Sequence, residues 1–278
     1  MLETRKLVAI SYANEKYIKA AWLNRKCAIK VGKADRAIIY TPNDIDADFG
    51  KENKEILSSS RGNGYWLWKP YFIKKTLEQM NEGDILLYTD AATVCVDSIW
   101  KLVKAMEADG QCRMIFSLGK KRIEAAYTKR DAFILMDCDE EYISMTPQAD
   151  ASAILLVNNK SNQEFVDDYL EFAKDKRILT DSENEMGKEN YSEFIMHRHD
   201  QSILSLLANK RNFSFFRDSS QFGVPDIYDE AVLKRSCYPQ ILNHHRIANA
   251  KNLLQVKIKQ AEFIKMLEYK LYLWKKNR

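Results

Sequence analysis

The chain has 278 residues, of which 46% are hydrophobic and 29% charged, a composition typical of a globular protein with a sizeable core. Glycine (9) and proline (5) are scarce, which argues against low-complexity linkers and repeats. No stretch approaches the ~18 apolar residues of a membrane span. The apolar run behind the charged N-terminal residues is too short for a signal peptide.

The five cysteines are odd in number, widely spaced and without a CxxC pair, which indicates reduced thiols in a cytoplasmic protein rather than a disulfide framework or a zinc site. The net charge is +4, but residues 251–278 hold eight Lys or Arg against two acids. That segment therefore carries +6, and the rest of the chain carries −2. This distribution disfavours a general nucleic-acid surface and concentrates the basicity at the C-terminus.

Strands and helices are predicted to alternate from the start of the chain. Strands over 6–12 and 36–40 flank a helix over 15–31, which Gly32 closes, and this β-α-β opening implies a parallel sheet. We expect one α/β domain over residues 1–246 with a mainly parallel central sheet, followed by a long basic amphipathic helix over residues 247–278. Further strands are predicted at 85–89, 113–118 and 151–157, and further helices at 98–108, 124–136, 164–174 and around 197–204.

Asp90 follows the buried strand Ile85-Leu86-Leu87-Tyr88-Thr89 directly. Because ligands bind beyond the carboxyl ends of strands in open α/β sheets, Asp90 is a candidate site residue. The alternative is that it caps the next helix or stabilises a turn.

The segment from Ser60 to Ile73 combines two glycines, two cations and five aromatic residues. Arg61 and Lys69 are able to neutralise phosphates, and Trp66 or Trp68 to stack on a base or sugar. Alternatively, the tryptophans belong to the core and the cations are solvated. The spacing matches neither a Walker loop nor a dinucleotide-binding glycine motif.

Two histidine-containing clusters follow. The first, His197-Arg198-His199-Asp200-Gln201, is expected at a helix, where Asp200 and Gln201 would face a cleft or else cap and solvate the helix start. A zinc site is disfavoured there because residues two apart point to different helix faces. In the second cluster, His244 or His245 is a candidate metal ligand together with Asp90, or an ordinary surface histidine.

The basic C-terminal helix suits two roles. Leucines, aromatic residues and lysines alternate over 253–274, as in helices that lie on anionic membranes. The other role is a helix packed on the domain with a solvated basic face.

With these residues laid out, the sequence resembles glycosyltransferases of the GT-A fold, which are single Rossmann-like α/β domains. The segment 87–93 is similar to the strand-end segment that usually reads Asp-x-Asp in that family. Asp200-Gln201 is similar to the Asp-Gln pair of the glycogenin and lipopolysaccharide-galactosyltransferase group. The ordered set of motifs, from Gly64-Tyr65-Trp66 to Gln201-Ser202, resembles bacterial proteins associated with capsule or O-antigen synthesis.

One departure affects the metal. If Asp90 matches the first Asp of the family motif, the second falls on Ala92, which cannot bind a cation. Either a divalent ion (Mn²⁺ or Mg²⁺) is held by a thinner shell of Asp90, a histidine and the diphosphate, or Arg61 and Lys69 replace the ion.

The resemblance implies a retaining, hexosyltransferase-like enzyme. It would transfer a sugar from a nucleotide-diphosphate sugar to a bacterial surface polysaccharide (capsule or lipopolysaccharide) or to a lipid-linked acceptor at the inner face of the plasma membrane. Asp200 and Gln201 would hold the donor sugar and its positively charged transition state. Arg61 and Lys69 would hold the diphosphate, and Asp90 the ribose or the metal. The other expected nucleotide-sugar contacts are Ser11, Tyr12, Asp44, Trp66 and Ala91.

Two rival functions remain open at this point. A nucleotidyl- or phospho-transferase of surface glycan synthesis would use a similar phosphate cradle. A non-enzymatic assembly factor would use the C-terminal segment alone and bind no nucleotide.

Overall fold

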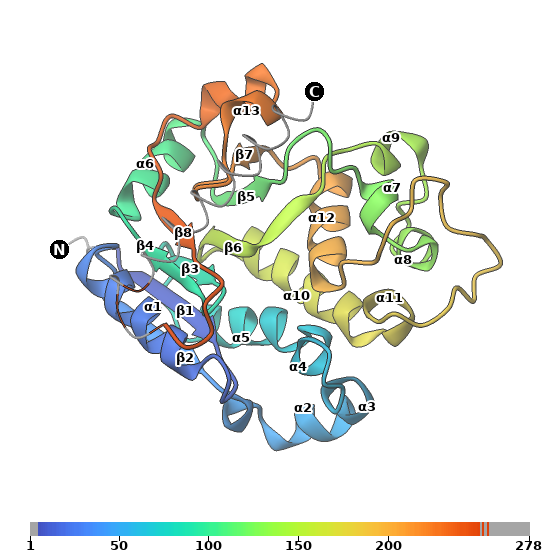
Figure 1. Ribbon diagram of the computed structural model, residues 1–278, viewed down its shortest axis with the longest axis horizontal. Helices are drawn as coiled ribbons and strands as arrows, with labels where there is room; N and C mark the ends of the chain where they lie inside the picture. The colour runs from blue at the N-terminus through green and yellow to red at the C-terminus, as the bar shows by residue number, and fades with distance from the viewer. Residues whose placement is uncertain (1–4, 251, 253–254, 256–278) are drawn as a thin grey trace, which may run out of the picture.

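The computed structural model describes residues 5–250, 252 and 255, and Figure 1 shows its helices and strands. The strands are β1 (Leu7–Tyr12), β2 (Arg36–Tyr40), β3 (Ile85–Thr89), β4 (Thr93–Cys95), β5 (Arg113–Ser117), β6 (Ala149–Val157), β7 (Phe215–Arg217) and β8 (Leu242–His244). The longer helices are α1 (Ile18–Lys30), α5 (Trp68–Leu77), α6 (Trp100–Ala108), α10 (Lys160–Lys174) and α12 (Asp200–Lys210). The shorter ones are α2 (Ala47–Glu52), α3 (Lys54–Leu57), α4 (Gly62–Tyr65), α7 (Glu124–Tyr127), α8 (Arg130–Leu135), α9 (Glu141–Ser144), α11 (Lys176–Leu179) and α13 (Glu230–Arg235), with 3₁₀ turns η1 (Pro42–Asp44) and η2 (Pro225–Ile227).

The central sheet has six strands in the order β2-β1-β3-β6-β5-β7. Strand β6 runs antiparallel to both of its neighbours, and the other five strands share one direction. A second, two-stranded sheet pairs β4 with β8 in antiparallel register, with Thr93 opposite His244. The expected α/β domain with a mainly parallel sheet is therefore confirmed.

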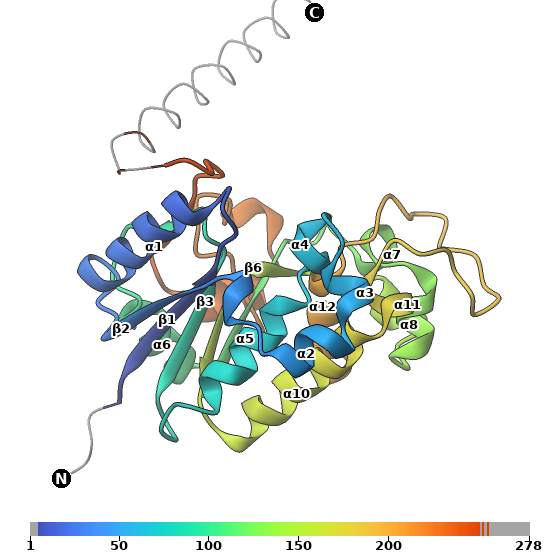
Figure 2. The ribbon, with the colours of Figure 1, turned by 90° about the horizontal axis from the view of Figure 1, so that it is seen from below.

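Helices cover both faces of the sheet, and each face has its own core. Strand residues such as Leu7, Ile85 and Leu155 point to the side of α1 and α6. Their chain neighbours Val8 and Leu86 point to the side of α5, α10 and α12. Figure 2 shows α1 on one side of the sheet and α5 and α10 on the other. Burial on both faces explains why these strands are near-continuous apolar runs.

Three local expectations were wrong. The predicted helix 124–136 is divided into α7 and α8 because Thr128 and Lys129 are extended, with ψ of 126° and 153°. His197 and His199 precede α12 instead of lying in it, and His199 has a φ of 56°. The short strands β4, β7 and β8 were not foreseen.

The expected basic helix lies almost entirely outside the described residues, so its packing and its role stay predictions. Within the described part of the chain, no helix has the length and apolar composition needed to cross a membrane.

Candidate active site

Strand direction brings polar side chains from several segments to one edge of the sheet. Asp90 follows β3 and Asp218 follows β7, so both lie at the carboxyl edge of the parallel strands. Asp150 is the second residue of β6. Because β6 runs the opposite way, its beginning lies at the same edge, and Asp90 N–H donates to the Ser152 carbonyl there (2.9 Å). The β4–β8 pair then adds His244 opposite Thr93.

A cavity of about 590 Å³ opens at this edge, and we call it the large cavity. It contains three carboxylates, three guanidinium groups, an imidazole and an amide. Its lining residues are Asp90, Ala92, Thr93, Leu118, Arg122, Asp150, Ser152, Arg198, Gln201, Asp218, Phe222, Ile227, Tyr228, His244 and Arg246.

A second cavity of about 420 Å³, which we call the aromatic cavity, lies beyond the end of β1. Asp90 and Ala92 line both cavities, so the two meet at the turn between β3 and β4. A ligand is thus able to extend from one into the other past Asp90. The aromatic cavity is lined by Tyr12, Ala13, Asn14, Lys16, Tyr17, Ser60, Gly62, Asn63, Trp66, Trp68, Tyr88, Asp90, Ala91 and Ala92.

Asp150, Asp218 and His244 form a cluster in which one potential ligand atom from each residue lies within 4.8 Å of the others. Burial and then the neighbouring Asp150 carboxylate raise the pKa of Asp218. Neither carboxylate forms an ion pair among the residues that the structure describes. Thr93 and Ser152 hydroxyls contact the two ring nitrogens of His244 at 2.8 and 3.2 Å, which fixes the orientation of the ring.

The cluster differs from the expected metal shell, which stays a prediction. His244 was predicted to bind a cation together with Asp90, but the carboxylates grouped with it are Asp150 and Asp218. Asp90 lines the same cavity without belonging to the cluster. His245, the other candidate, is buried, and its Nε2 has no hydrogen-bond partner among the described residues.

A buried ion pair lies directly behind Asp90. Lys69 Nζ is 2.5 Å from Asp200 Oδ2 and 3.9 Å from Asp90 Oδ1, and it donates to the Ala151 carbonyl at 3.0 Å. Lys69 and Asp200 are 3% and 4% exposed. The carboxylates of Asp200 and Asp90 raise the pKa of Lys69 against the opposing effect of its burial, so the lysine is charged.

Two tyrosine hydroxyls complete this network. Tyr88 donates to Asp90 Oδ1 at 2.7 Å, and Tyr169 donates to Asp200 Oδ2 at 3.2 Å. The structure thus brings together Asp90, Lys69 and Asp200, three residues that sequence reasoning singled out from distant segments. It does not place Lys69 or Asp200 on the wall of either cavity.

Gln201, the neighbour of Asp200, lines the large cavity. Its amide Nε2 donates to Gln148 Oε1 at 2.7 Å, which leaves its carbonyl oxygen as the atom available to a ligand. Gln148 in turn donates to the fully buried Glu124 at 3.3 Å. Burial raises the pKa of Glu124 to about 7.

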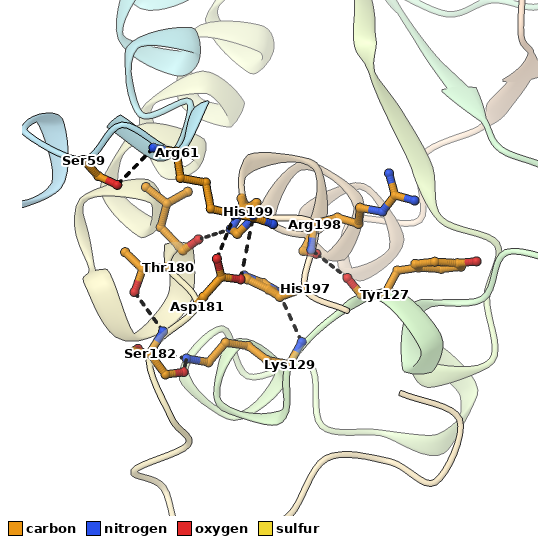
Figure 3. A network of polar contacts seen from close by, with 12 residues as sticks. Ser59, Arg61, Tyr127, Lys129, Thr180, Asp181, Ser182, His197, Arg198 and His199 are labelled. Carbon is orange, nitrogen blue, oxygen red and sulfur yellow. Dashed lines mark hydrogen bonds and ion pairs between the residues drawn. The ribbon is translucent and has the colours of Figure 1, made fainter. Parts of the chain in front are cut away.

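Arg61 belongs to a different network, on the side of the His197–His199 segment opposite to the Arg198 side chain (Figure 3). Its Nε is 2.8 Å from Asp181 and donates to His199 Nε2 at 3.0 Å. The two histidines are buried, and each donates to a backbone carbonyl, His197 to Ile178 and His199 to Leu179. Burial lowers the pKa of both imidazoles, so they are neutral. Their hydrogen bonds attach the segment 197–199 to α11.

The remaining predicted contacts divide into two groups. Tyr12, Trp66 and Ala91 line the aromatic cavity, where Tyr12 stacks on Trp68 at 3.8 Å and Trp66 stacks on His199 at 5.4 Å. Ser11 and Asp44 line neither cavity. Ser11 is buried near the end of β1. Asp44, the last residue of η1, accepts hydrogen bonds from Thr41.

Asp150, Asp218 and the three arginines of the large cavity were missed by sequence reasoning. Asp218 carried a short signal, since it follows Phe215-Phe216-Arg217, the strand β7, as Asp90 follows β3. Asp150 carried none, because an acid at the start of a strand is at the ligand-binding edge only when that strand is reversed.

No protein-family model matches the sequence, and no curated protein sequence does. Similar solved structures include apo WbbM, a bifunctional glycosyltransferase (11% identity, TM-score 0.46), covering 88% of this chain and 46% of that one. The match to mouse xyloside xylosyltransferase 1 (9% identity, TM-score 0.45) covers 88% of this chain and 99% of that one. The match to the galactosyltransferase LgtC with donor and acceptor sugar analogues (13% identity, TM-score 0.47) covers 90% of this chain and 94% of that one. This chain thus spans slightly less than half of WbbM. All three are glycosyltransferases, but TM-scores below 0.5 are too low to decide a function.

The buried ion pair makes a prediction about stability. Lys69→Met leaves the Asp200 carboxyl buried without its counter-charge, and we expect a loss of about 3–5 kcal/mol in the free energy of unfolding at pH 7.5, measured with urea. Burial raises the folded-state pKa of Asp200 above its unfolded value, so the variant regains stability as the pH falls and the carboxyl becomes neutral. The double variant Lys69→Met/Asp200→Leu is the control and should recover most of the loss. Unchanged stability of Lys69→Met would contradict the ion pair.

Proposed function

We propose that this protein is a glycosyltransferase that uses a nucleotide-diphosphate sugar as donor. The observation that carries the proposal is the junction of two cavities at Asp90 and Ala92. One cavity offers aromatic rings to a base, and the other offers carboxylates, an imidazole and an amide to a diphosphate and a sugar. A donor molecule has the same succession of apolar, anionic and hydroxyl-rich parts.

The nucleoside would lie in the aromatic cavity. Tyr17 and Trp66 supply partly exposed rings there, and Asn14 and Asn63 supply amide groups that are able to hydrogen-bond a base or ribose. Asp90 is at the boundary, where a ribose hydroxyl would reach it. The side chain is 45% exposed, and Tyr88 fixes its orientation from below.

The Asp150–Asp218–His244 cluster fits a divalent cation. Two carboxylates meet there without an ion-pair partner among the described residues, and carboxylate ligands suit Mn²⁺ and Mg²⁺. A cation at this position would offset the negative charge that builds on the diphosphate leaving group. Ser152 and Ser220 donate to Asp150 and Asp218 at 2.7 and 2.8 Å, and so hold the carboxylates in place.

Gln201 is the residue that we assign to the reacting sugar. Because its amide nitrogen is bound to Gln148, its oxygen is able to approach the positive charge that develops at the anomeric carbon. Asp200 lies behind the cavity wall, and we give it a positioning role through Lys69 and the start of α12.

The finer parts of the proposal rest on the sequence resemblance. They are a hexosyl donor, retention at the anomeric carbon, and a bacterial surface polysaccharide or lipid-linked acceptor. Recruitment to an anionic membrane by the C-terminal segment belongs to the same group. Proton NMR of the product gives the anomeric configuration directly.

A thermal-shift panel tests the proposal as a whole. The full chain is heated with UDP, GDP, CDP, ADP and dTDP, each with and without MnCl₂. A ligand that binds only the native state raises the apparent stability, by about 2.7 kcal/mol at one hundred times its Kd. We expect one nucleoside diphosphate to stabilise the protein and MnCl₂ to increase its effect. Stabilisation by none of the five would contradict the proposal. Turnover of a nucleoside triphosphate in place of a nucleotide sugar would favour a nucleotidyl- or phospho-transferase.

The metal cluster makes a separate prediction. Asp150→Asn and Asp218→Asn should each weaken Mn²⁺ binding about tenfold, since each removes a charged ligand. The readout is the electron paramagnetic resonance signal of free Mn²⁺ in a titration with protein. The control is Asp226→Asn, which removes an exposed carboxylate outside both cavities. Because burial and Asp150 raise the pKa of Asp218, Mn²⁺ affinity should fall as the pH is lowered. Equal Mn²⁺ binding by all variants would remove the cluster from the proposal.

Gln201 is tested by the rate of transfer. Gln201→Ala should bind the nucleoside diphosphate as the wild type does and lower kcat by roughly 10²–10³-fold, the usual cost of removing one preorganised polar group at a developing charge. Gln79→Ala, at an exposed position beyond α5, is the matched control. A Gln201→Ala enzyme with undiminished kcat would show that the amide does not contact the reacting sugar.

A further inference from the structure

We propose that Arg122 and Arg198, together with Arg246, form a subsite for an acidic group of the second substrate, a phosphate, sulfate or carboxylate. The inference rests on the proposed function, since it names the acceptor class of the same cavity. It predicts that the acceptor sugar, or a group attached to it, is anionic.

The three guanidinium groups line the large cavity together and lack acidic partners. None of them forms an ion pair among residues 5–250 of the structure. The Nε of Arg198 is buried without a hydrogen-bond partner in that range. Burial and the positive charges of Arg122 and Arg246 lower the pKa of Arg198, while Tyr127 and the carboxylate of Asp150 oppose the shift.

Tyr127 holds two of these arginines on the same side of the cavity. Arg122 and Arg198 lie 5.7 and 5.1 Å from the centre of its ring. Figure 3 shows the Arg198 side chain directed away from His197 and His199, toward the side where Tyr127 lies. The third cation, Arg246, is 5.1 Å from the ring of Phe222. Ring faces orient guanidinium groups without neutralising them, which leaves the charge available to a ligand.

Two other basic residues that the sequence singled out near the site are already neutralised. Lys69 is paired with Asp200, and Arg61 with Asp181. Desolvation of the partly buried Arg198 guanidinium costs stability, and it forms no ion pair within the described residues, whereas solvent screens the exposed Arg122 and Arg246. A bound anion would repay that cost, because a guanidinium group binds phosphate or carboxylate through two parallel hydrogen bonds.

Position separates this subsite from the donor. Arg122 follows β5, and β5 lies three strands away from β1, on the order of 14 Å across the sheet. Neither Arg122 nor Arg198 lines the aromatic cavity where the nucleoside would lie. The cluster of Asp150, Asp218 and His244 belongs to β6, β7 and β8, and it offers the diphosphate a separate place in the cavity. The arginine pair is therefore left for a second molecule.

The test is a titration of the full chain with inorganic sulfate, in the presence of the stabilising nucleoside diphosphate and MnCl₂ at saturation. Chloride keeps the ionic strength constant, and the readout is the midpoint of thermal unfolding. Sulfate stabilises proteins in general, so the measured quantity is the difference between variants. We compare the wild type with Arg122→Gln and Arg198→Gln. The control is Lys121→Gln, which removes one positive charge from the same loop outside the cavity.

We expect the saturable part of the sulfate effect to persist with the nucleotide bound, to weaken about tenfold in both arginine variants, and to be unchanged in Lys121→Gln. The nucleoside diphosphate should bind all four proteins equally. If the arginine variants lose affinity for the diphosphate instead, the arginines serve the donor and the proposal is overturned. Equal sulfate titrations in all four proteins, an adventitious ion only, would overturn it too.

Failure of the proposed function gives a different result. No nucleoside diphosphate would then bind, while sulfate binding without nucleotide would still depend on Arg122 and Arg198. Should Arg198→Gln fold poorly, Arg122→Gln decides the matter alone, because Arg122 is exposed.

Discussion

The candidate site depends on one buried contact, the ion pair between Lys69 and Asp200. It joins α5 to the start of α12, and the same ammonium group also donates to the Ala151 carbonyl on β6. Three elements from distant parts of the chain therefore have their positions fixed at one nitrogen atom. Asp90 lies 3.9 Å from the same nitrogen, so the electric field of Lys69 also acts on the cavity floor.

Such a pair contributes little net stability by itself, because desolvation of the two charges offsets their attraction. Its value here is geometric. Gln201 follows Asp200 directly, so fixing Asp200 also fixes the first turn of α12 and the amide in the large cavity. Gln148 and Glu124 hold that amide from the other side, and the raised pKa of Glu124, about 7, reflects how completely this support is buried.

Much of the architecture was predictable because it depends on local patterns. The apolar runs at β1, β3 and β6 and the amphipathic pattern of α10 indicate their elements directly, and the β-α-β opening implies the parallel pairing. Asp90 was found by the same reasoning, since its strand is long and its neighbours are apolar. The junction of Asp90, Lys69 and Asp200 was expected as well, although as a shared cavity and not as a buried contact.

The site residues that the sequence could not reveal are placed by the direction and pairing of strands. Asp150 joins the site only because β6 is reversed, and His244 only because β8 pairs with the three-residue strand β4. Strands of three residues have no periodicity to detect. The ion-pair partner of Lys69 could not be foreseen for a related reason. A cation beside glycines and tryptophans suggests a phosphate contact, whereas its actual partner, Asp200, is 131 positions away.

The distribution of charge around the large cavity follows from these placements. Lys69, the buried cation behind the cavity, forms an ion pair with Asp200. The charges that lack an ion-pair partner within the described chain are sorted by sign, with Asp150 and Asp218 together and Arg122 and Arg198 together on Tyr127. Folding alone would favour mixing them into salt bridges, since the opposite charges line the same cavity. Their separation has a physical reason if two ligands of opposite charge bind there, a cation that carries the donor diphosphate and an anionic group on the acceptor.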